Sequence, residues 1–389
     1  MQRIYLDNCL TSKPDPQVVE AMMPYLTDHF YFPGNFISTG SLAKKAISDF
    51  KKTIAQSMNA EEQEIHLTSS GTAANNVGIK GYIMANADKG GHIICSEIDY
   101  PDILTNAAFF EESGFDVTYL GADKDGLINL DELQNAITNE TILVMTTFAN
   151  HVMGTIQPIK KISEIIKNKN TQTALFVDAG QAYGRMLIDV KELGIDIMSV
   201  SAHKIHGPQG AGALYVKKGI NLSQTKHGIV RMDDLDTGGI SMAALAGFAK
   251  AVEIQFKDID NNIKYIRSLQ NRLLEGIQKN IDHIYINGPI GENRICHNLN
   301  VSMDYIEGEA IMMMLDLAGI TVATGSACAS QGLKANYILM ATGRNFVQSH
   351  GSMKFTLSKF NTENEIDYVI EKLTEIVKTL RERSPLTKN

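Results

Sequence analysis

Short apolar runs alternate with amphipathic segments through the first half of the chain. Apolar runs bounded by polar turns indicate buried strands, while apolar residues recurring at helical spacing indicate helices. Because strands and helices take turns, the pattern predicts an α/β fold with a mostly parallel, seven-stranded type of sheet and helices on both faces. The predicted strands are 65–68, 92–95, 116–120, 142–147, 174–177, 197–200 and 211–216, and the predicted helices are 17–26, 41–58, one ending near 85, 103–113, 130–137 and 159–167.

The pattern changes in the second half. Residues 219–237 are polar and irregular, and two long helices follow at 242–256 and 262–279. We therefore predict a large α/β domain over 17–255. The segments 1–16 and 256–389 would form a smaller α+β domain that carries the loop around Cys328. The other elements expected in these segments are strands at 3–7, 298–302 and 355–357 and helices at 307–317 and 363–381.

Composition narrows the classes of function. The chain of 389 residues is 44% hydrophobic and 21% charged, which is ordinary for a globular protein. A net charge of -8 gives no support for a nucleic-acid partner. No apolar run approaches the ~18 residues of a membrane span, and the first residues lack the core of a signal peptide. The four cysteines are scattered without a CxxC pair, so we expect no metal site, free thiols and a cytoplasmic location.

The turn that contains Lys204 is the first candidate for chemistry. Ser201-Ala202-His203-Lys204 ends an apolar run, and the Gly-rich stretch 207–212 turns the chain back into a second run. A lysine at a strand end beside a histidine is well placed to form a Schiff base with a carbonyl cofactor, usually pyridoxal phosphate. A single lysine in a turn is more often only solvated, so the companion motifs decide. The stretch 207–212 lacks the following helix of a nucleotide loop.

Two companion motifs follow predicted strands. Ser69-Ser70-Gly71-Thr72 opens a helix, and small hydroxylated residues there expose backbone N–H groups to a phosphate; an ordinary Ser/Thr N-cap is the alternative. Asp178-Ala179-Gly180-Gln181 follows the strand 174–177, where a carboxylate can hold a pyridinium N–H, or cap a helix. Ligands of such sheets bind beyond the carboxyl ends of the strands, where these motifs fall.

With these motifs in place, the chain resembles the cysteine desulfurase family of the class V aminotransferase superfamily, in the branch with a long cysteine loop. The resemblance covers nearly the whole chain. The motifs that carry it are Ser69-Ser70-Gly71-Thr72, Asp178-Ala179-Gly180-Gln181, Ser201-Ala202-His203-Lys204 and Thr324-Gly325-Ser326-Ala327-Cys328-Ala329-Ser330, with flanking pieces at Gly154-Thr155-Ile156-Gln157-Pro158 and Tyr305-Ile306-Glu307-Gly308-Glu309.

The resemblance implies a fold-type I enzyme, homodimeric, that takes sulfur from L-cysteine and delivers it to an acceptor protein. Lys204 would hold pyridoxal phosphate, and Cys328 would be the nucleophile that carries the sulfur as a persulfide. Its small neighbours leave such a thiol exposed, although a free cysteine is more often buried and structural. The other implied cofactor contacts are Asp178 at the pyridine nitrogen, Gln181 at the phenolic oxygen, and Gly71, Thr72, Ser201 and His203 at the phosphate.

Four positions depart from the family pattern. Tyr100 occupies the position where the family has a histidine stacked on the cofactor. His151, which follows Asn150, occupies the position where the family has an asparagine near the ring hydroxyl. Lys354 replaces the arginine that binds the substrate carboxylate, so it keeps the charge and loses the bidentate fork. Asp236-Thr237-Gly238-Gly239 replaces the Arg-Ser-Gly-Thr of the partner subunit's phosphate site. We expect Tyr100 and His151 at the cofactor, and Asn150 and Lys354 at the substrate.

These departures leave three functions open. The first is cysteine desulfurase. The second is a related pyridoxal phosphate enzyme of class V, an aminotransferase or lyase, acting on another amino acid. The third is a weakly active paralogue that works by binding a partner protein.

Overall fold

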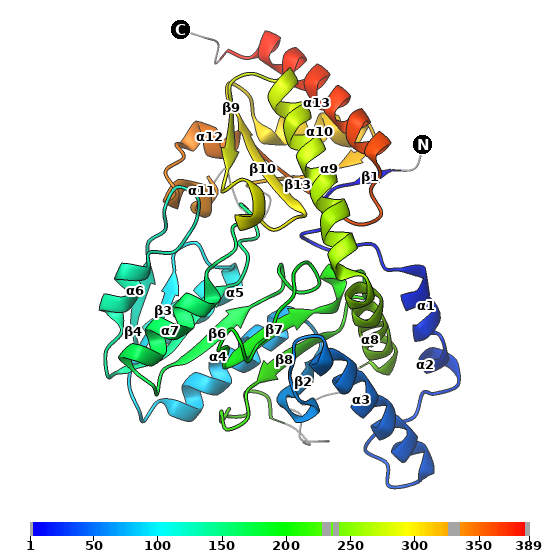
Figure 1. Cartoon of the computed structure of the whole chain (residues 1–389), viewed down its shortest axis with the longest axis vertical. Helices are drawn as coiled ribbons and strands as arrows, with labels where there is room; N and C mark the ends of the chain where they lie inside the picture. Colours follow the sequence, from blue (N-terminus) through cyan, green and yellow to red (C-terminus); the bar gives the residue numbers. More distant parts are fainter. Residues whose placement is uncertain (1–2, 228–234, 236–240, 326–334, 386–389) are drawn as a thin grey trace.

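The computed structural model describes residues 3–227, 235, 241–325 and 335–385. The chain is arranged around two sheets, a larger one in the lower half of Figure 1 and a smaller one above it. The predictions for Cys328 and for Asp236-Thr237-Gly238-Gly239 concern residues that lie outside the described ranges.

The larger sheet has seven strands in the order β2-β8-β7-β6-β5-β3-β4. All neighbouring pairs are parallel except the two that involve β8, which runs against both β2 and β7. The α/β class and the mostly parallel sheet are therefore confirmed. The strands are β2 (Ile65–Thr68), β3 (His92–Ser96), β4 (Asp116–Leu120), β5 (Thr141–Thr147), β6 (Ala174–Asp178), β7 (Ile197–Ser201) and β8 (Gly212–Val216).

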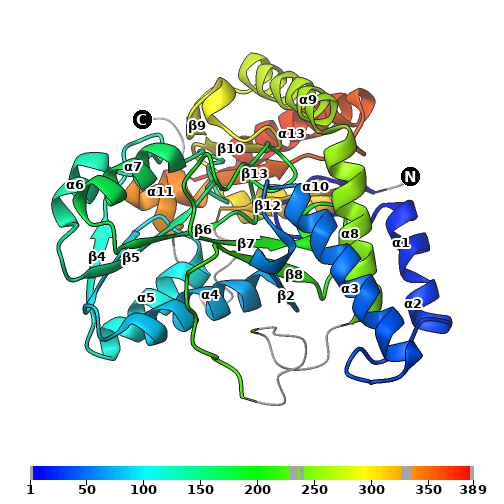
Figure 2. The same cartoon turned by 60° about the horizontal axis from the view of Figure 1, so that its bottom comes forward.

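Helices cover both faces of this sheet, and the strand sequences show why. In β6 the side chains of Leu175 and Val177 enter one hydrophobic core, and those of Ala174 and Phe176 enter the core on the opposite face. Helices α4 (Gly71–Asn86) and α5 (Pro101–Glu112) close the second core. Figure 2 shows them on the opposite side of the sheet from α7. The first core is covered by α3 (Ser38–Gln56), α6 (Leu130–Ala136), α7 (Ile159–Lys169) and α8 (Met242–Lys257).

The smaller sheet has the order β12-β13-β10-β9 and is antiparallel. It packs against α9, α10 and α13 around a separate hydrophobic core. The strands are β9 (Ile284–Asn287), β10 (Asn298–Met303), β12 (Ala323–Thr324) and β13 (Ser352–Thr356). The helices are α9 (Ile259–Asn280), α10 (Gly308–Leu317), α11 (Tyr337–Ala341), α12 (Phe346–His350) and α13 (Glu363–Arg383).

The N-terminal segment joins the smaller sheet's side of the molecule. Strand β1 (Ile4–Tyr5) pairs in parallel with β11 (Ile320–Thr321), and Asp7 forms an isolated bridge with Thr356. Leu6 is fully buried in the core of the smaller sheet. The first residues therefore lie beside the C-terminal part of the chain, while the division into two domains with a boundary near 255 stays a prediction.

Several predicted helices have other bounds than expected, and α3, for example, begins at Ser38 and ends at Gln56. The single helix expected over 17–26 is two short helices, α1 (Pro16–Met22) and α2 (Pro24–Thr27), because Pro24 has no N–H to continue the first one. The helix expected from 262 begins earlier, at Ile259, directly after α8. Within the part of the chain that the structure describes, no helix combines the length and the apolar character needed to cross a membrane.

Candidate active site

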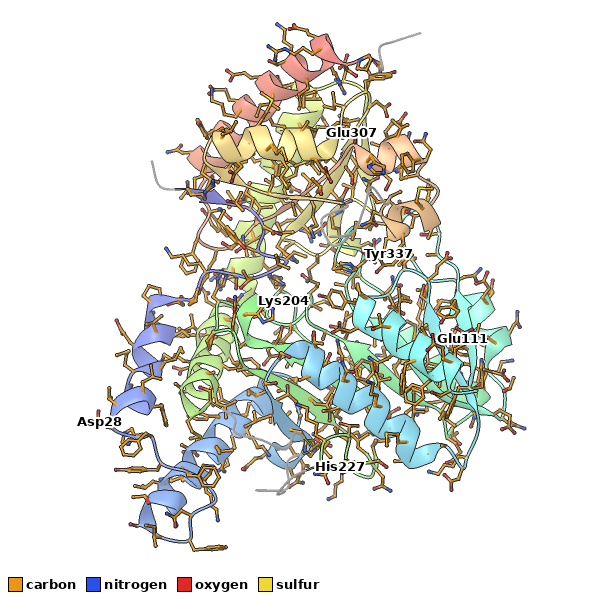
Figure 3. All side chains as sticks on the ribbon, turned by 180° about the vertical axis from the view of Figure 1, so that it is seen from behind. Asp28, Glu111, Lys204, His227, Glu307 and Tyr337 are labelled. Atoms are coloured by element: carbon orange, nitrogen blue, oxygen red, sulfur yellow. The ribbon has the colours of Figure 1, made fainter. Side chains whose placement is uncertain are left out.

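The carboxyl ends of four neighbouring strands and of β2 meet at one edge of the larger sheet. Lys204 lies in a single turn of 3-10 helix after β7, and Asp178 is the last residue of β6. Tyr100 and His151 follow the ends of β3 and β5. Figure 3 shows Lys204 where the larger sheet faces the smaller one. Side chains that are far apart in the sequence therefore gather at one place, as the strand-end argument predicts.

A cavity of about 120 Å³ opens at this edge. It brings together most of the residues that the sequence motifs single out. Its lining residues are Leu10, Gly71, Thr72, Asn75, Tyr100, Asp102, Asp178, Gly180, Ser199, Val200, Ser201, His203 and Lys204.

Asp178 presents a buried carboxylate to this cavity. Its Oδ1 accepts a hydrogen bond from the Gly180 N–H at 2.8 Å, and its Oδ2 accepts one from Asn75 Nδ2 at 2.9 Å. Burial raises the pKa of Asp178, while the positive charge of Lys204 and these two donors lower it. A Cβ built on Gly180 would stand 3.1 Å from Asp178 Oδ1 and 3.7 Å from Lys204 Nζ, so glycine leaves room for both groups.

Asn75 is a site residue that sequence reasoning missed. Besides Asp178, its amide donates to Asp102 at 3.0 Å, and its Oδ1 accepts a hydrogen bond from Ser199. The side chain is almost fully buried. Asn75 lies one turn after Gly71 on α4, on the face of the helix that turns to the sheet. That helical spacing is the signal that could have pointed to it.

Lys204 has aromatic and cationic neighbours. Its Nζ lies 5.1 Å from the centroid of the Tyr100 ring, which meets the His151 ring edge-on at 4.8 Å. Burial lowers the pKa of Lys204, and the charges of Arg185 and Lys354 lower it further, against the opposing effects of Cys9 and Asp178. This amine therefore gives up its proton more readily than an exposed lysine.

His151 is buried and neutral. Burial moves its pKa well below the ordinary value, and the charges of Lys354 and Lys204 act in the same direction. Its Nδ1 has no hydrogen-bond partner among the described residues. A buried ring nitrogen of this kind can bond to a polar atom of a bound group.

The start of α4 forms the other side of the cavity. Ser70 caps the helix by accepting a hydrogen bond from the Ala73 N–H at 3.0 Å, which leaves the backbone N–H groups of Gly71 and Thr72 facing out. A Cβ on Gly71 would stand 3.2 Å from Ser201 Cβ, so only glycine packs there without displacement. Burial lowers the pKa of nearby His203 to about 4, so this ring is neutral.

Three other predicted site residues, like His151, are not among the residues that line the cavity, and they have protein partners. Gln181 Nε2 donates to the carbonyl of Cys9 at 3.0 Å. Asn150 Nδ2 donates to Ile98 O at 3.0 Å, and its Oδ1 accepts from two backbone N–H groups of the following turn. Lys354 Nζ donates to Cys9 Sγ at 3.4 Å. The contacts of Asn150 shape its own loop, and its role at the substrate stays a prediction.

Arg185 is a second buried residue that the sequence did not reveal. Its Nη2 donates to Asn8 O at 2.9 Å and to Lys204 O at 2.8 Å, which ties the lysine turn to the N-terminal segment. Burial lowers the pKa of Arg185 to about 10, and it remains charged at neutral pH.

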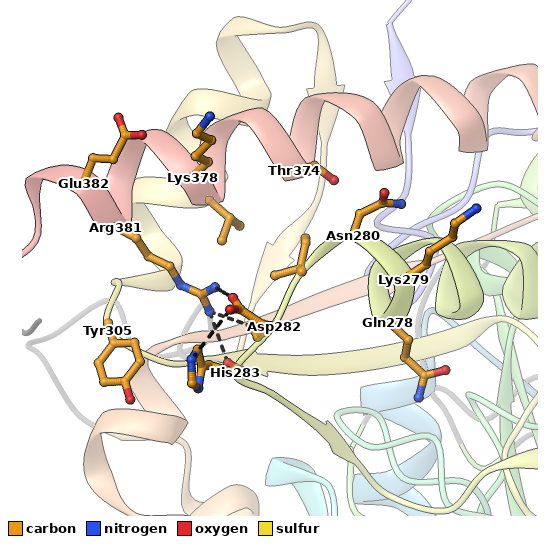
Figure 4. A pocket seen from close by; sticks show the side chains of 12 residues that line it. Gln278, Lys279, Asn280, Asp282, His283, Tyr305, Thr374, Lys378, Arg381 and Glu382 are labelled. Carbon is orange, nitrogen blue, oxygen red and sulfur yellow. Dashed lines mark hydrogen bonds and ion pairs between the residues drawn. The ribbon is translucent and has the colours of Figure 1, made fainter. Parts of the chain in front are cut away.

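A larger cavity of about 680 Å³ lies away from Lys204, between α9, α13 and the start of β9. Figure 4 shows Arg381 reaching across it to Asp282 and His283, and the Arg381 and Asp282 side chains are 2.7 Å apart. It contains none of the predicted site residues. Among the described residues, no cluster of three His, Cys, Asp or Glu side chains has the arrangement of a metal site.

The residues at the strand ends fit pyridoxal phosphate. Asp178 supplies a buried carboxylate, and a buried carboxylate requires a cationic partner such as a pyridinium N–H. The start of a long helix accepts a phosphate. The Lys204 amine lines the cavity beside Asp178, and the His151 ring, whose Nδ1 has no partner among the described residues, packs against Tyr100 at the cavity wall.

Comparisons with known proteins agree with this geometry. The family model of class V aminotransferases matches residues 4–369. The cysteine desulfurase IscS of Methanosarcina thermophila is 42% identical over 384 residues, which cover 99% of this chain and 94% of the relative. A solved NifS-like protein superposes with a TM-score of 0.91 at 29% identity, over 97% of this chain and 100% of that one. The structure of SspA in complex with cysteine superposes with a TM-score of 0.80 at 26% identity, over 92% and 100%.

Proposed function

The chain belongs to the class V aminotransferase family and, within it, to the cysteine desulfurases, and we propose that it converts L-cysteine to L-alanine while Cys328 takes the sulfur as a persulfide. The observation that carries this proposal is the convergence of Lys204 and Asp178 on one cavity at the ends of β7 and β6. Both groups are needed for pyridoxal phosphate chemistry, and both lie where ligands of such a sheet bind.

The proposed roles in cofactor binding follow from the contacts. Lys204 would hold the cofactor, Asp178 would face its ring nitrogen, and Asn75 would fix the orientation of Asp178. The phosphate would be held by Gly71, Thr72, Ser201 and His203. Tyr100 would stack on the cofactor ring, and His151 and Gln181 would lie at the phenolic oxygen of that ring.

When bound, pyridoxal phosphate supplies an electron sink next to the Cα of the amino acid. Lys204 Nζ, whose pKa burial lowers, is suited to take the proton from Cα and to return a proton on the way to alanine. Lys354 would hold the substrate carboxylate. The Cys328 thiolate would attack the substrate sulfur, so that an S–S bond forms as the Cβ–S bond breaks and Cβ gains a proton.

A direct experiment separates the three functions that the sequence leaves open. The holoenzyme is incubated with L-cysteine and a reductant, and alanine and sulfide are quantified. Desulfurase function predicts both products in equal amounts. A cofactor absorbance change with another amino acid, without alanine from cysteine, would favour the aminotransferase or lyase. No response to any amino acid would favour the binding paralogue.

Restoring the family residues at two positions is expected to raise activity in different ways. Lys354→Arg should lower KM for L-cysteine, because a bidentate carboxylate contact is stronger than a single ammonium contact by about 1–3 kcal/mol, or roughly 5- to 150-fold. Tyr100→His should mainly raise kcat, by about 100-fold at most, because imidazole transfers protons near neutral pH and phenol does not. Steady-state kinetics of both variants checks the separation.

A conservative replacement serves as the control for Tyr100→His. Tyr100→Phe keeps the ring over Lys204 and should leave kcat close to that of the wild type if the phenol moves no proton. Efficient turnover by the wild-type enzyme, with lower activity in both Lys354→Arg and Tyr100→His, would show that the site is adapted to its present residues.

We also propose a homodimer, a sulfur-acceptor protein as partner and a cytoplasmic location. Apolar side chains between α1 and α3 support the dimer, since Phe30 is 71% and Phe36 96% exposed. Cys9, Cys95 and Cys296 are unpaired thiols, which is typical of a reducing compartment.

A further inference from the structure

The N-terminal segment brings Cys9 to the site through strand β13. Asp7 pairs with Thr356, the Thr356 N–H donates to Leu6 O at 2.7 Å, and the Cys9 N–H donates to Thr356 Oγ1 at 2.9 Å. Lys354 lies two residues before Thr356 on the same strand, so its side chain lies on the same face. The backbone of Cys9 is also held from the other side by Gln181.

The Cys9 thiol connects Lys354 to the loop that carries His151. Its sulfur accepts a hydrogen bond from Lys354 Nζ at 3.4 Å and donates one to the His151 carbonyl, also at 3.4 Å. Cys9 is 5% exposed and Lys354 7% exposed. The buried thiol therefore connects the ammonium group to the backbone of the loop after β5.

The Lys354 ammonium also acts on the reacting centre through its charge. Its positive charge lowers the pKa of both Lys204 and His151. A lysine has a long flexible stem and no planar fork, so its direction depends on the groups around it. Cys9 restricts where the Nζ atom can lie before a substrate arrives.

We propose that Cys9 is a positioning residue that holds Lys354 in place for the α-carboxylate of the amino-acid substrate. The inference rests on the proposed function, because it assigns the carboxylate to Lys354. Cys9 itself forms no bond to the substrate and carries no sulfur. Its contribution is to substrate affinity, and the rate of the chemical step does not depend on it.

The test compares Cys9→Ala with Cys9→Ser in the holoenzyme. Cys9→Ala should raise KM for L-cysteine roughly 2- to 10-fold, the effect of one lost hydrogen bond, and leave kcat within about twofold. Cys9→Ser should restore most of the affinity, since a hydroxyl also accepts from Lys354 and donates to His151. Cys9→Ala added to Lys354→Ala should cause no further loss, because the two residues act together.

A binding measurement compares ligands with and without the α-carboxylate. L-alanine and L-alaninamide, which lacks the carboxylate, are titrated into each variant, and the cofactor absorbance is followed. Cys9→Ala should weaken L-alanine binding and leave L-alaninamide binding unchanged. Equal weakening of both ligands, unchanged L-alanine binding, or a lower kcat at constant KM would overturn the proposal. If L-alanine binding depends on Cys9 while the wild-type enzyme forms no alanine from cysteine, the proposed function fails and the positioning role stands.

Discussion

Replacing Lys204 with alanine is expected to give a protein that neither retains pyridoxal phosphate covalently nor forms alanine from L-cysteine. The Lys204 amine is the group at the end of β7 that faces both Asp178 and Tyr100. Its loss removes the covalent attachment and the proton carrier together, so turnover should fall by at least on the order of 10²–10⁴-fold. The wild-type protein should be yellow, and borohydride should fix the cofactor on Lys204, which peptide mass spectrometry can locate.

A matched control separates this loss from a general effect of removing a lysine. Lys218 follows β8, and its side chain is exposed. Lys218→Ala should keep the colour, the borohydride adduct on Lys204 and the activity. An adduct on another lysine, or a Lys204→Ala protein that stays active, would refute the assignment of Lys204. A wild-type protein that takes up no added pyridoxal phosphate would refute the enzyme function itself.

Cys328→Ser should abolish sulfide release and leave the cofactor bound. The nucleophile that takes the sulfur and the lysine that holds the cofactor are separate groups, so the absorbance spectrum should be unchanged. Without a thiolate at 328, release should fall to background, on the order of 10³-fold or more below the wild-type rate. Incubation of the wild-type protein with L-cysteine, followed by mass spectrometry, should locate a persulfide on Cys328 and on no other cysteine.

The described cysteines explain why we expect this selectivity. Cys9, Cys95 and Cys296 are all buried, and burial raises the pKa of the Cys95 and Cys296 thiols. A buried thiol with a raised pKa is a poor nucleophile and is out of reach of an acceptor protein. Cys95→Ala should therefore release sulfide at the wild-type rate. Undiminished release by Cys328→Ser, or a persulfide on Cys9, would reject the role of Cys328.

The larger sheet could be predicted because its central strands β5, β6 and β7 are buried along their whole length. β6 is buried along its whole length, and its residues alternate between two cores, so both the run and its polar boundaries are visible in the sequence. In the smaller sheet β10 is also buried along its whole length and could be predicted, but other strands differ. β9 is a partly exposed edge strand whose hydrogen bonds come from β10, β12 has only two residues, and so does β11, which pairs with β1 outside this sheet. These strands form because distant segments pair with them in the folded chain, and the sequence has no periodic pattern that predicts them.

The site shows the same division. Asp178, Lys204 and Gly71 could be placed together because each follows a strand of the predicted sheet. Asn75 and Cys9 were missed, because their roles come from partners that are distant along the chain; for Asn75 the only signal in the sequence is its helical spacing from Gly71. Asn75 is 103 residues from Asp178, and Cys9 is 345 residues from Lys354. A sequence motif shows which group performs chemistry, but the side chains that orient this group appear only once the strands are assembled.

The assay that tests the central claim most directly measures alanine formed from L-cysteine by the holoenzyme, with and without a thiol reductant. With the reductant, alanine and sulfide should accumulate together at a constant rate. Without it, we predict about one alanine per subunit and then a halt, because the persulfide on Cys328 has no acceptor. No alanine under either condition, from a protein that carries its cofactor on Lys204, would contradict the assignment of this chain as a cysteine desulfurase.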